Sequence, residues 1–316
     1  MNCDKRLANS PQWFLMSPKD INMRIPESVR KCVVYLGIEI TDDATGVSEV
    51  KFKGTGFIVS VPTSIQGMNF HYVVTAKHVA VKLDRQDAFF ISANSKDGGS
   101  RGIKAETKNV EWHYPEGGDS ADVAVITLGI NLSDFDIIAM PIGMFIKNTD
   151  IESLGVGPGD EVIISGLFSK HPGKSKNMPI IRTGNIAMIP DEPIPVHLFG
   201  DMDAYLIEAR SIGGLSGSPV ILLKPVYLLD DAKKVVTAQM YLLGLIHGHW
   251  DVPPESIIDE SDMESGISAH VNMGIAIVVP AQKIIEIIEK PKLREQRNQI
   301  VRDYKAKNYP TQDDQK

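Results

Sequence analysis

Short apolar runs rich in β-branched residues follow one another along almost the whole chain, and turn residues separate them. Several runs alternate between apolar and polar residues with a period of two, and Gly, Pro, Asp or Asn bounds most of them, as is typical of β-strands. Many short strands with few helices predict an all-β sandwich or barrel and argue against alternating βαβ units. The predicted strands are Lys31–Ile40, Val50–Val61, Tyr72–Ala76, Ala88–Ser92, Ala121–Leu128, Glu161–Ile164, Ile180–Ile189, Ala204–Ala209, Pro219–Leu223, Val235–Ile246 and Met273–Val279.

Only two segments have the pattern of a helix. One begins near Val79. The other covers Ala281–Lys290, and within it Ile284, Ile285 and Ile288 share one face. The sequence therefore predicts a helix close to the C-terminal end of the strand-rich region.

The strand-rich sequence changes character over residues 148–158, which lie between two halves of about equal size. We therefore expect two β lobes, formed by residues 29–147 and 148–290, with an N-terminal extension over residues 1–28. Residues 291–316 are highly charged and are expected to form a solvated helix or tail. This tail is a candidate for recruiting a regulatory partner.

Composition excludes several classes of protein. With 316 residues, of which 43% are hydrophobic and 23% charged, the chain is long enough for two compact cores and too apolar for general disorder. Its formal charge of −7 argues against a general binder of nucleic acid or anionic membranes. No apolar run reaches the roughly 18 residues of a transmembrane helix.

Two further features favour a cytoplasmic protein. The apolar cluster Trp13–Met16 is too short for the core of a signal peptide. The only cysteines are Cys3 and Cys32, so nothing demands an oxidising compartment, and two free thiols are favoured over a bridge between them.

The segment Ser211–Val220 (SIGGLSGSPV) combines a serine with several glycines. A serine nucleophile needs a base for its proton and donors for the oxyanion that forms. Gly213 and Gly214 before Ser216 give the backbone the freedom to turn past a reacting carbonyl. The alternative is an ordinary Gly/Ser turn between two strands.

A base and a carboxylate are available elsewhere in the chain. Among eight histidines, His78 stands out because it directly follows the apolar strand of the segment YVVTAKHVA. Asp122 opens the apolar run of the segment DSADVAVITL, and a carboxylate at such a place is costly unless it is paired. Asp119 is the competing acid, although it falls in a turn where a solvated carboxylate is the default.

These three segments, in the order His78, Asp122, Ser216, resemble the chymotrypsin-like serine peptidases, nearest to the bacterial HtrA-type catalytic domains. The G-x-S-G-S-P pattern around Ser216 is similar to the family's G-x-S-G-G-P. The segment before His78 resembles T-A-x-H-[CV], Asp122 lies in the family's D-[VIL]-A-[VL] pattern, and Gly54–Val59 (GTGFIV) resembles G-[ST]-G-F.

The resemblance implies a serine endopeptidase with His78, Asp122 and Ser216 as its catalytic triad, peptides or proteins as substrates, and no cofactor or metal. It implies an oxyanion hole formed by the N–H groups of Gly214 and Ser216. The implied fold is two antiparallel six-stranded β-barrels with a C-terminal helix. The chain departs from the family in Leu215, which stands where Asp or Asn is common, and we expect no PDZ domain after residue 290.

The resemblance also places Arg210 near the base of the specificity pocket, where an arginine would favour an acidic substrate side chain. The alternative is that Arg210 points to solvent or pairs with Glu208. The acidic segment Asp251–Asn272 follows the pocket-flanking strand. It is expected to be a solvated loop, with repulsion of acidic substrates as the second hypothesis.

His247 and His249 are two residues apart on a predicted strand, so both would face one side, as metal ligands can. A third ligand at suitable spacing is missing, so we expect packing or polar contacts rather than a metal. The resemblance places His247 beside the active site, in contact with Asp122 or with substrate.

Two other functions are alternatives to a serine endopeptidase. A latent or inactive peptide-binding module on a protease fold is the main alternative, because of Leu215. An esterase of the α/β-hydrolase kind is disfavoured, because Ser218 breaks the G-x-S-x-G elbow and helices are scarce.

Overall fold

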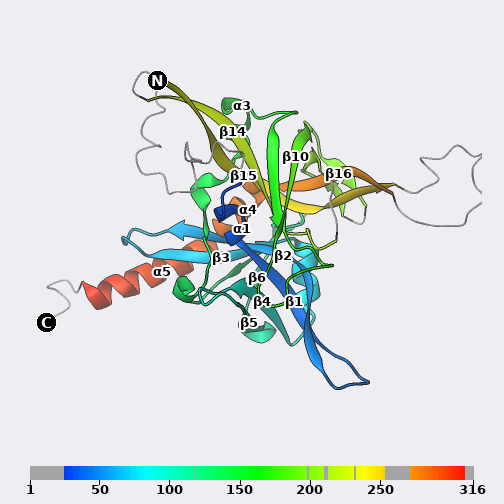
Figure 1. Ribbon diagram of the computed structural model, residues 1–316. Coiled ribbons are helices and arrows are strands. Elements are labelled where there is room, and N and C mark those ends of the chain that lie inside the picture. The colour runs from blue at the N-terminus through cyan, green and yellow to red at the C-terminus, as the bar shows by residue number, and fades with distance from the viewer. Residues whose placement is uncertain are drawn as a thin grey trace, which may run out of the picture.

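The computed structural model describes residues 25–117, 119–197, 199–209, 213–230, 233–252 and 271–309. Two β lobes make up most of it, and the helices lie at their margins (Figure 1). Among the described residues, no helix is both long enough and apolar enough to cross a membrane.

The first lobe is an eight-stranded sheet. Its strands are β1 (Val33–Thr41), β2 (Ser48–Pro62), β3 (Asn69–Thr75), β4 (Ala88–Asn94), β5 (Ser100–Glu106), β6 (Trp112–His113), β7 (Ala124–Thr127) and β8 (Met140–Pro141). They pair in the order β5-β4-β1-β2-β3-β7-β6, and β8 pairs in parallel with β2. Because β3 lies between β2 and β7, the residues just after β3 and just before β7 come together at one end of the sheet.

The second lobe is a closed barrel with the strand order β10-β13-β16-β15-β14-β9. Its strands are β9 (Glu161–Gly166), β10 (Ile180–Met188), β13 (Tyr205–Glu208), β14 (Pro219–Asp230), β15 (Lys233–Val252) and β16 (Val271–Pro280). A separate hairpin joins β11 (Ile194–Val196) to β12 (Gly200–Met202). The long antiparallel pair β14 and β15 extends well beyond the barrel (Figure 1).

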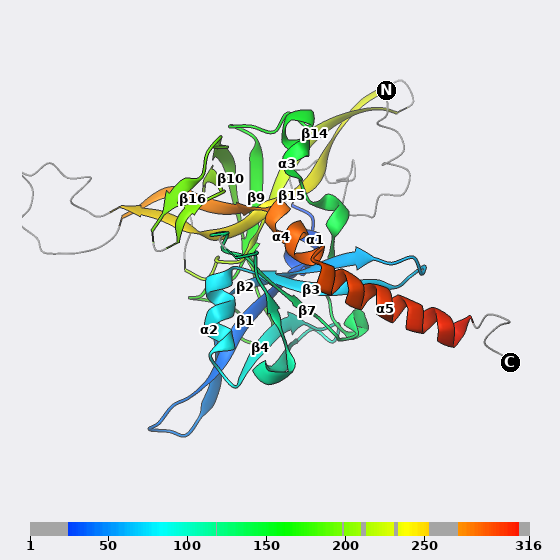
Figure 2. The same cartoon turned by 180° about the vertical axis from the view of Figure 1, so that it is seen from behind.

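The helices are short except for the last. They are α1 (Ser28–Lys31), α2 (Lys77–Asp84), α3 (Asn148–Ser153), α4 (Ala281–Ile288) and α5 (Pro291–Asn308), with 3₁₀ turns at Thr107–Asn109, Leu132–Asp134 and Ile142–Met144. α4 buries Ala281, Ile284, Ile287 and Ile288. α5 follows it directly and points away from the body of the molecule in both ribbon views (Figures 1 and 2).

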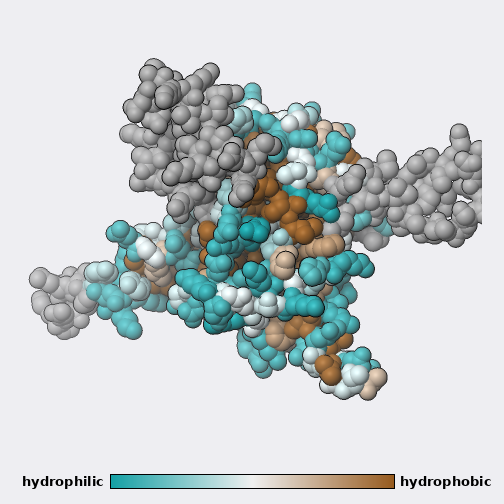
Figure 3. All heavy atoms as spheres, viewed as in Figure 1, coloured by the Kyte–Doolittle hydropathy of each residue, from teal (hydrophilic) through white to brown (hydrophobic). Residues whose placement is uncertain are grey.

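One apolar core runs through both lobes and includes Phe57 and Val73 of the first and Ile163 and Leu245 of the second. The barrel adds a cluster of its own around Val220 and Leu243. On the face seen in Figure 3 the surface is mainly hydrophilic, with hydrophobic atoms gathered near the centre. The continuous core explains how side chains from both lobes are held together in one site.

The predicted all-β class, the closed six-stranded barrel and the C-terminal helix are confirmed. The first lobe contains eight strands rather than the expected six. Two of them, β6 and β8, have only two residues each and cannot show a period in the sequence. β5 was not predicted either: its side chains are exposed or half-buried, so its sequence lacks the apolar alternation of a strand. Residues after Pro291, expected to be a solvated helix or tail, form α5 as far as Asn308.

Cys32 is a free, buried thiol. It donates a hydrogen bond to the Val29 carbonyl at 3.4 Å, and burial raises its pKa to about 12. Cys3 lies outside the described residues. The thiol of Cys32 is therefore an inert packing group.

Candidate active site

Asp122 is a fully buried carboxylate placed just before β7. Its Oδ1 accepts the backbone N–H of His78 at 2.8 Å, and its Oδ2 lies 2.7 Å from His78 Nδ1. His78 is the second residue of α2, where a backbone N–H has no partner within the helix. Asp122 therefore satisfies the start of the helix and orients the imidazole with the same side chain.

His247 contacts the same carboxylate from the second lobe. Its Nδ1 lies 2.6 Å from Asp122 Oδ2, and its side chain is only 11% exposed. The register between β15 and β16 shifts between Ile246 and Gly248, so His247 sits in a bulge of β15. A bulge re-aims a side chain, and here it directs His247 toward Asp122.

The charge of Asp122 depends on these contacts. Burial by itself disfavours the ionised form, but hydrogen bonds from His247 and His78 outweigh it and hold the pKa of the carboxyl well below its usual range. Asp122 is therefore a carboxylate at neutral pH, and each imidazole donates its Nδ1–H to it.

Phe199 completes the group of rings around Asp122. It lies on the loop between β11 and β12, and its ring centroid is 4.6 Å from that of His247 and 6.2 Å from that of His78, edge to face in both cases. The two imidazoles are 5.7 Å apart. Nothing in the sequence around Phe199 indicated this position, because its partners come from distant segments.

Ser216 lies on a tight turn held between β2 and β15. The Thr55 N–H donates to the Ser216 carbonyl at 3.0 Å, and the Gly217 N–H donates to the Ile246 carbonyl at 2.7 Å. Thr55 Oγ1 also donates to the Gly214 carbonyl at 2.7 Å. These bonds hold Ser216 close to Ile246, the residue that precedes His247.

Glycine is required in this turn. Gly217 has φ +83°, and a Cβ there would lie 2.2 Å from the Thr55 carbonyl oxygen and 3.0 Å from the backbone nitrogen of Ala76. Because Ala76 is two residues before His78, this close approach brings the Ser216 turn to the start of α2. Gly214 has φ +102°, and a Cβ there would meet the Leu167 carbonyl at 2.8 Å.

Two N–H groups of the turn remain available. Within the described part of the chain, neither the Gly214 N–H nor the Ser216 N–H donates a hydrogen bond to protein. The described residues also show no hydrogen bond between Ser216 Oγ and His78. Ser216 is partly exposed and the His78 side chain is 25% exposed, so both are accessible from solvent.

The other candidates from the sequence lie elsewhere. Asp119 pairs with Lys283 at 2.9 Å rather than with a histidine. Leu215 is fully buried in the barrel's own apolar cluster. Arg210 lies outside the described residues, as does almost all of the acidic segment, residues 253–270.

His249 does not join His247 as a ligand pair. Among the described residues, the only group able to hold a metal ion is His78, Asp122 and His247. The sequence placed only His247 of this group on the predicted strand; its other two members, His78 and Asp122, come from the first lobe.

Sequence reasoning missed the threonines that hold the site. Thr75 Oγ1 donates to the Thr55 carbonyl at 2.7 Å, and Thr55 Oγ1 accepts from the Leu167 N–H at 2.9 Å. Both threonines are fully buried. Thr55 lies inside the GTGF motif, which was the available signal.

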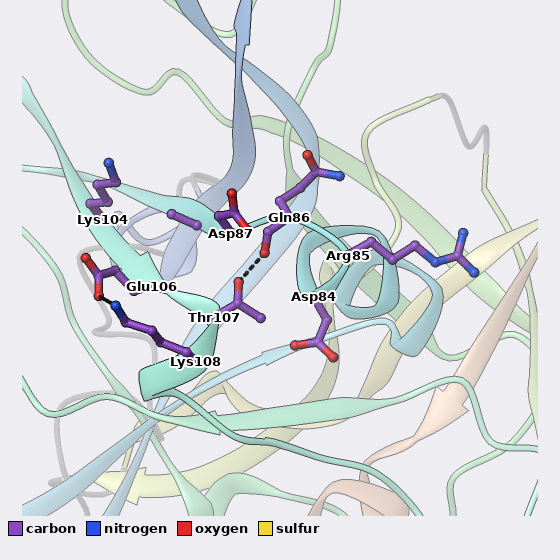
Figure 4. A pocket seen from close by; sticks show the side chains of 9 residues that line it. Asp84, Arg85, Gln86, Asp87, Lys104, Glu106, Thr107 and Lys108 are labelled. Carbon is purple, nitrogen blue, oxygen red and sulfur yellow. Dashed lines mark hydrogen bonds and ion pairs between the residues drawn. The ribbon is translucent and has the colours of Figure 1, made fainter.

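A separate cavity of about 500 Å³ lies at the far end of α2 from His78 (Figure 4). Its charged groups have both signs, and Lys108 pairs with Glu106 at 3.4 Å. Thr107 Oγ1 donates to the Gln86 carbonyl at 2.6 Å. Nothing in this cavity selects a ligand, so the candidate site remains the cluster at Asp122.

The chain has two β lobes, a buried Asp–His pair and a serine in a glycine-rich turn. This is the architecture of the chymotrypsin-like fold. No family model matches the sequence, and no curated protein matches it.

Many solved structures are similar to this chain, including the following three. Deg5 is 13% identical, with 86% of this chain and 94% of that chain covered and a TM-score of 0.44. The MamO protease domain from Magnetospirillum magneticum is 15% identical, with 68% and 93% covered and a TM-score of 0.38. An inactive serine-to-alanine mutant of Rv3671c from M. tuberculosis H37Rv is 15% identical, with 83% and 87% covered and a TM-score of 0.42.

Proposed function

We propose that this chain is a serine endopeptidase that hydrolyses peptide bonds with His78, Asp122 and Ser216. The observation that carries the proposal is the buried Asp122 carboxylate, which holds His78 by both its backbone N–H and its Nδ1. With Nδ1–H donated to Asp122, the neutral ring has its lone pair on Nε2, as a general base requires.

The reaction follows from these roles. His78 Nε2 takes the Ser216 hydroxyl proton while Oγ attacks the substrate carbonyl, and the imidazolium is stabilised by Asp122. The same proton passes to the leaving amine, which departs and leaves an ester on Ser216. Water then attacks the ester, His78 again acts as base, and the acid product and free Ser216 are formed.

The oxyanion of each tetrahedral intermediate would be bound by the N–H groups of Gly214 and Ser216. Their lack of protein acceptors within the described residues supports this role, because preorganised donors must not already be used. Gly214 has φ +102°, a backbone conformation that glycine adopts readily and other residues avoid.

A fluorophosphonate probe tests the proposal. It should label the full chain at Ser216, and the Ser216→Ala variant should not be labelled. Ser218→Ala is the matched control, because Ser218 lies in the same turn but its hydroxyl is buried and has no hydrogen-bond partner among the described residues. Labelling that persists in Ser216→Ala would exclude Ser216 as the nucleophile.

A second candidate is a latent or inactive peptide-binding module. The missing hydrogen bond between Ser216 Oγ and His78 within the described residues favours it, although catalytic hydrogen bonds are often long before substrate binds. Absence of labelling in a folded chain, together with peptide binding measured by calorimetry, would support this candidate over the protease. Labelling together with peptide cleavage would exclude it.

A further inference from the structure

Asp122 Oδ2 is shared by two imidazole nitrogens. His78 Nδ1 lies 2.7 Å from it and His247 Nδ1 lies 2.6 Å from it. The ligand atoms of these three side chains all lie within 4.8 Å of one another. The reaction needs only one histidine as its base, so the second imidazole is not required as a proton acceptor.

We propose that His78, Asp122 and His247 form a zinc site whose occupation switches the active site off; this regulation rests on the proposed peptidase function. Two imidazoles and one carboxylate are the donor types that Zn²⁺ takes in proteins, and three protein ligands leave a fourth position for water. The exposure of His78 gives an ion a path from solvent.

The distances are compatible with an ion after a small adjustment. Ligands about 2.1 Å from a tetrahedral zinc ion lie roughly 3.4 Å apart. The two N–O separations are now 2.6 and 2.7 Å, so the rings must move outward from Asp122. His78 lies in the first turn of a helix and His247 in a bulge, which are places where the backbone is least constrained by regular hydrogen bonding.

The charges also favour a cation. Asp122 is ionised, and its described ion-pair partners are only the two histidines. Zinc would add two positive charges beside the single negative charge of Asp122. A bound water in the remaining position can lose a proton to reduce the excess.

Zinc binding and catalysis exclude each other through the tautomer of His78. To bind zinc through Nδ1, each neutral imidazole moves its proton from Nδ1 to Nε2. His78 Nε2 then carries a proton and cannot accept that of Ser216. Only this proton moves, and no other covalent bond changes. When the zinc ion is removed, the proton returns to Nδ1.

Isothermal titration calorimetry with ZnCl₂ tests the site on the full Ser216→Ala chain, prepared without a polyhistidine tag. We expect one zinc ion per chain. Adding His247→Gln should weaken binding by about tenfold or more, since glutamine can still donate to Asp122 but is a poor zinc ligand. Adding His249→Gln, on the same strand, should leave the Kd within about twofold.

A Ser216→Ala chain that binds no zinc, or binds it equally well with His247→Gln, overturns the proposal. Circular dichroism establishes that each variant is folded. If His247→Gln does not fold, His78→Gln replaces it in the titration. Zinc binding by His78→Gln that is as tight as that of the parent chain would also overturn the proposal.

A second experiment separates this proposal from the protease function. Zinc should slow fluorophosphonate labelling of Ser216 with the Kd found by calorimetry, and chelation should restore the rate. If zinc binds the Ser216→Ala chain but the native chain is never labelled, the site stands and the protease proposal fails. If labelling is unaffected by saturating zinc, the regulatory role fails.

Discussion

Asp122 is the residue on which the candidate site depends. A buried carboxylate costs several kcal/mol unless charged or polar partners surround it. Here the His78 N–H and two imidazole Nδ1 atoms supply them. The same contacts that make the buried charge tolerable also orient the His78 imidazole.

His247 lies one contact away from His78, because both imidazoles donate to Asp122. Under the proposed peptidase function it is a positioning residue. We expect His247→Ala to lower kcat for peptide hydrolysis by about tenfold and to change KM little, as is usual when an outer hydrogen-bond partner is lost. His247→Asn retains a donor and should recover most of the rate. Equal rates in the native chain and His247→Ala, measured with a fluorogenic peptide, would contradict this role.

At the scale of elements, the turn over residues 213–218 before β14 is closely packed against the first lobe. Gly217→Ala places a Cβ 2.2 Å from the Thr55 carbonyl and 2.4 Å from Thr75 Oγ1, at φ +83°. We expect a loss of about 1–3 kcal/mol in the free energy of unfolding and a fall of about 100-fold in labelling rate, because the serine is displaced.

Gly129→Ala is the control for that variant. A Cβ at Gly129 meets no atom within 4 Å, and its φ is not in the left-handed region. Urea denaturation and the labelling rate should both be close to those of the native chain. Similar losses in the two variants would mean that the effect is not specific to the turn.

α5 is joined to the first lobe by a buried arginine. Arg297 donates to the Tyr72 hydroxyl at 3.0 Å and to the Ile288 carbonyl at 2.7 Å, and it pairs with Glu289 at 2.8 Å. The contact therefore ties the last helix to β3, the strand that leads to His78.

Arg297→Ala should cost about 2–4 kcal/mol of unfolding free energy, because it leaves a buried hydroxyl and a carbonyl without partners. Arg294→Ala, at an exposed position of the same helix, should change it by less than about 0.5 kcal/mol. Urea denaturation measures both. Equal effects would show that the helix is held by its apolar contacts alone.

At the scale of the whole molecule, Lys283 of α4 bridges the first lobe and the β12–β13 connection. It lies 2.9 Å from Asp119 and 3.1 Å from Asp203. Burial opposes the charge on Asp119, but the hydrogen bonds from Lys283 and the Ala121 N–H outweigh it and lower its pKa. This pairing makes a contribution to the free energy of unfolding that depends on pH.

A carboxyl whose pKa is lowered by folding stabilises the protein above its unfolded pKa, near 4, and this contribution is lost as the pH falls through the folded pKa. Asp119→Asn should therefore reduce the free energy of unfolding at pH 7 and reduce it less at pH 3. Asp43→Asn, at an exposed site, controls for the change in net charge. The same deficit at both pH values would contradict the prediction.

Much of the fold follows from local patterns. The apolar runs became β1–β4, β7, β9, β10 and β13–β16, since alternation along a strand reflects which face is buried. The exposed β5 and the two-residue strands β6 and β8 have no such pattern. Their pairing was decided by neighbouring strands.

By itself the sequence determined the strand-rich class and the three local segments that contain His78, Asp122 and Ser216. Only the tertiary structure decided that Asp122 accepts from two imidazoles, one of them 125 residues away. It also brought Phe199 against both rings. The physical reason is that the partner of His247 depends on how the two lobes pack and on the bulge in β15. The residues next to His247 in the sequence determine neither of these.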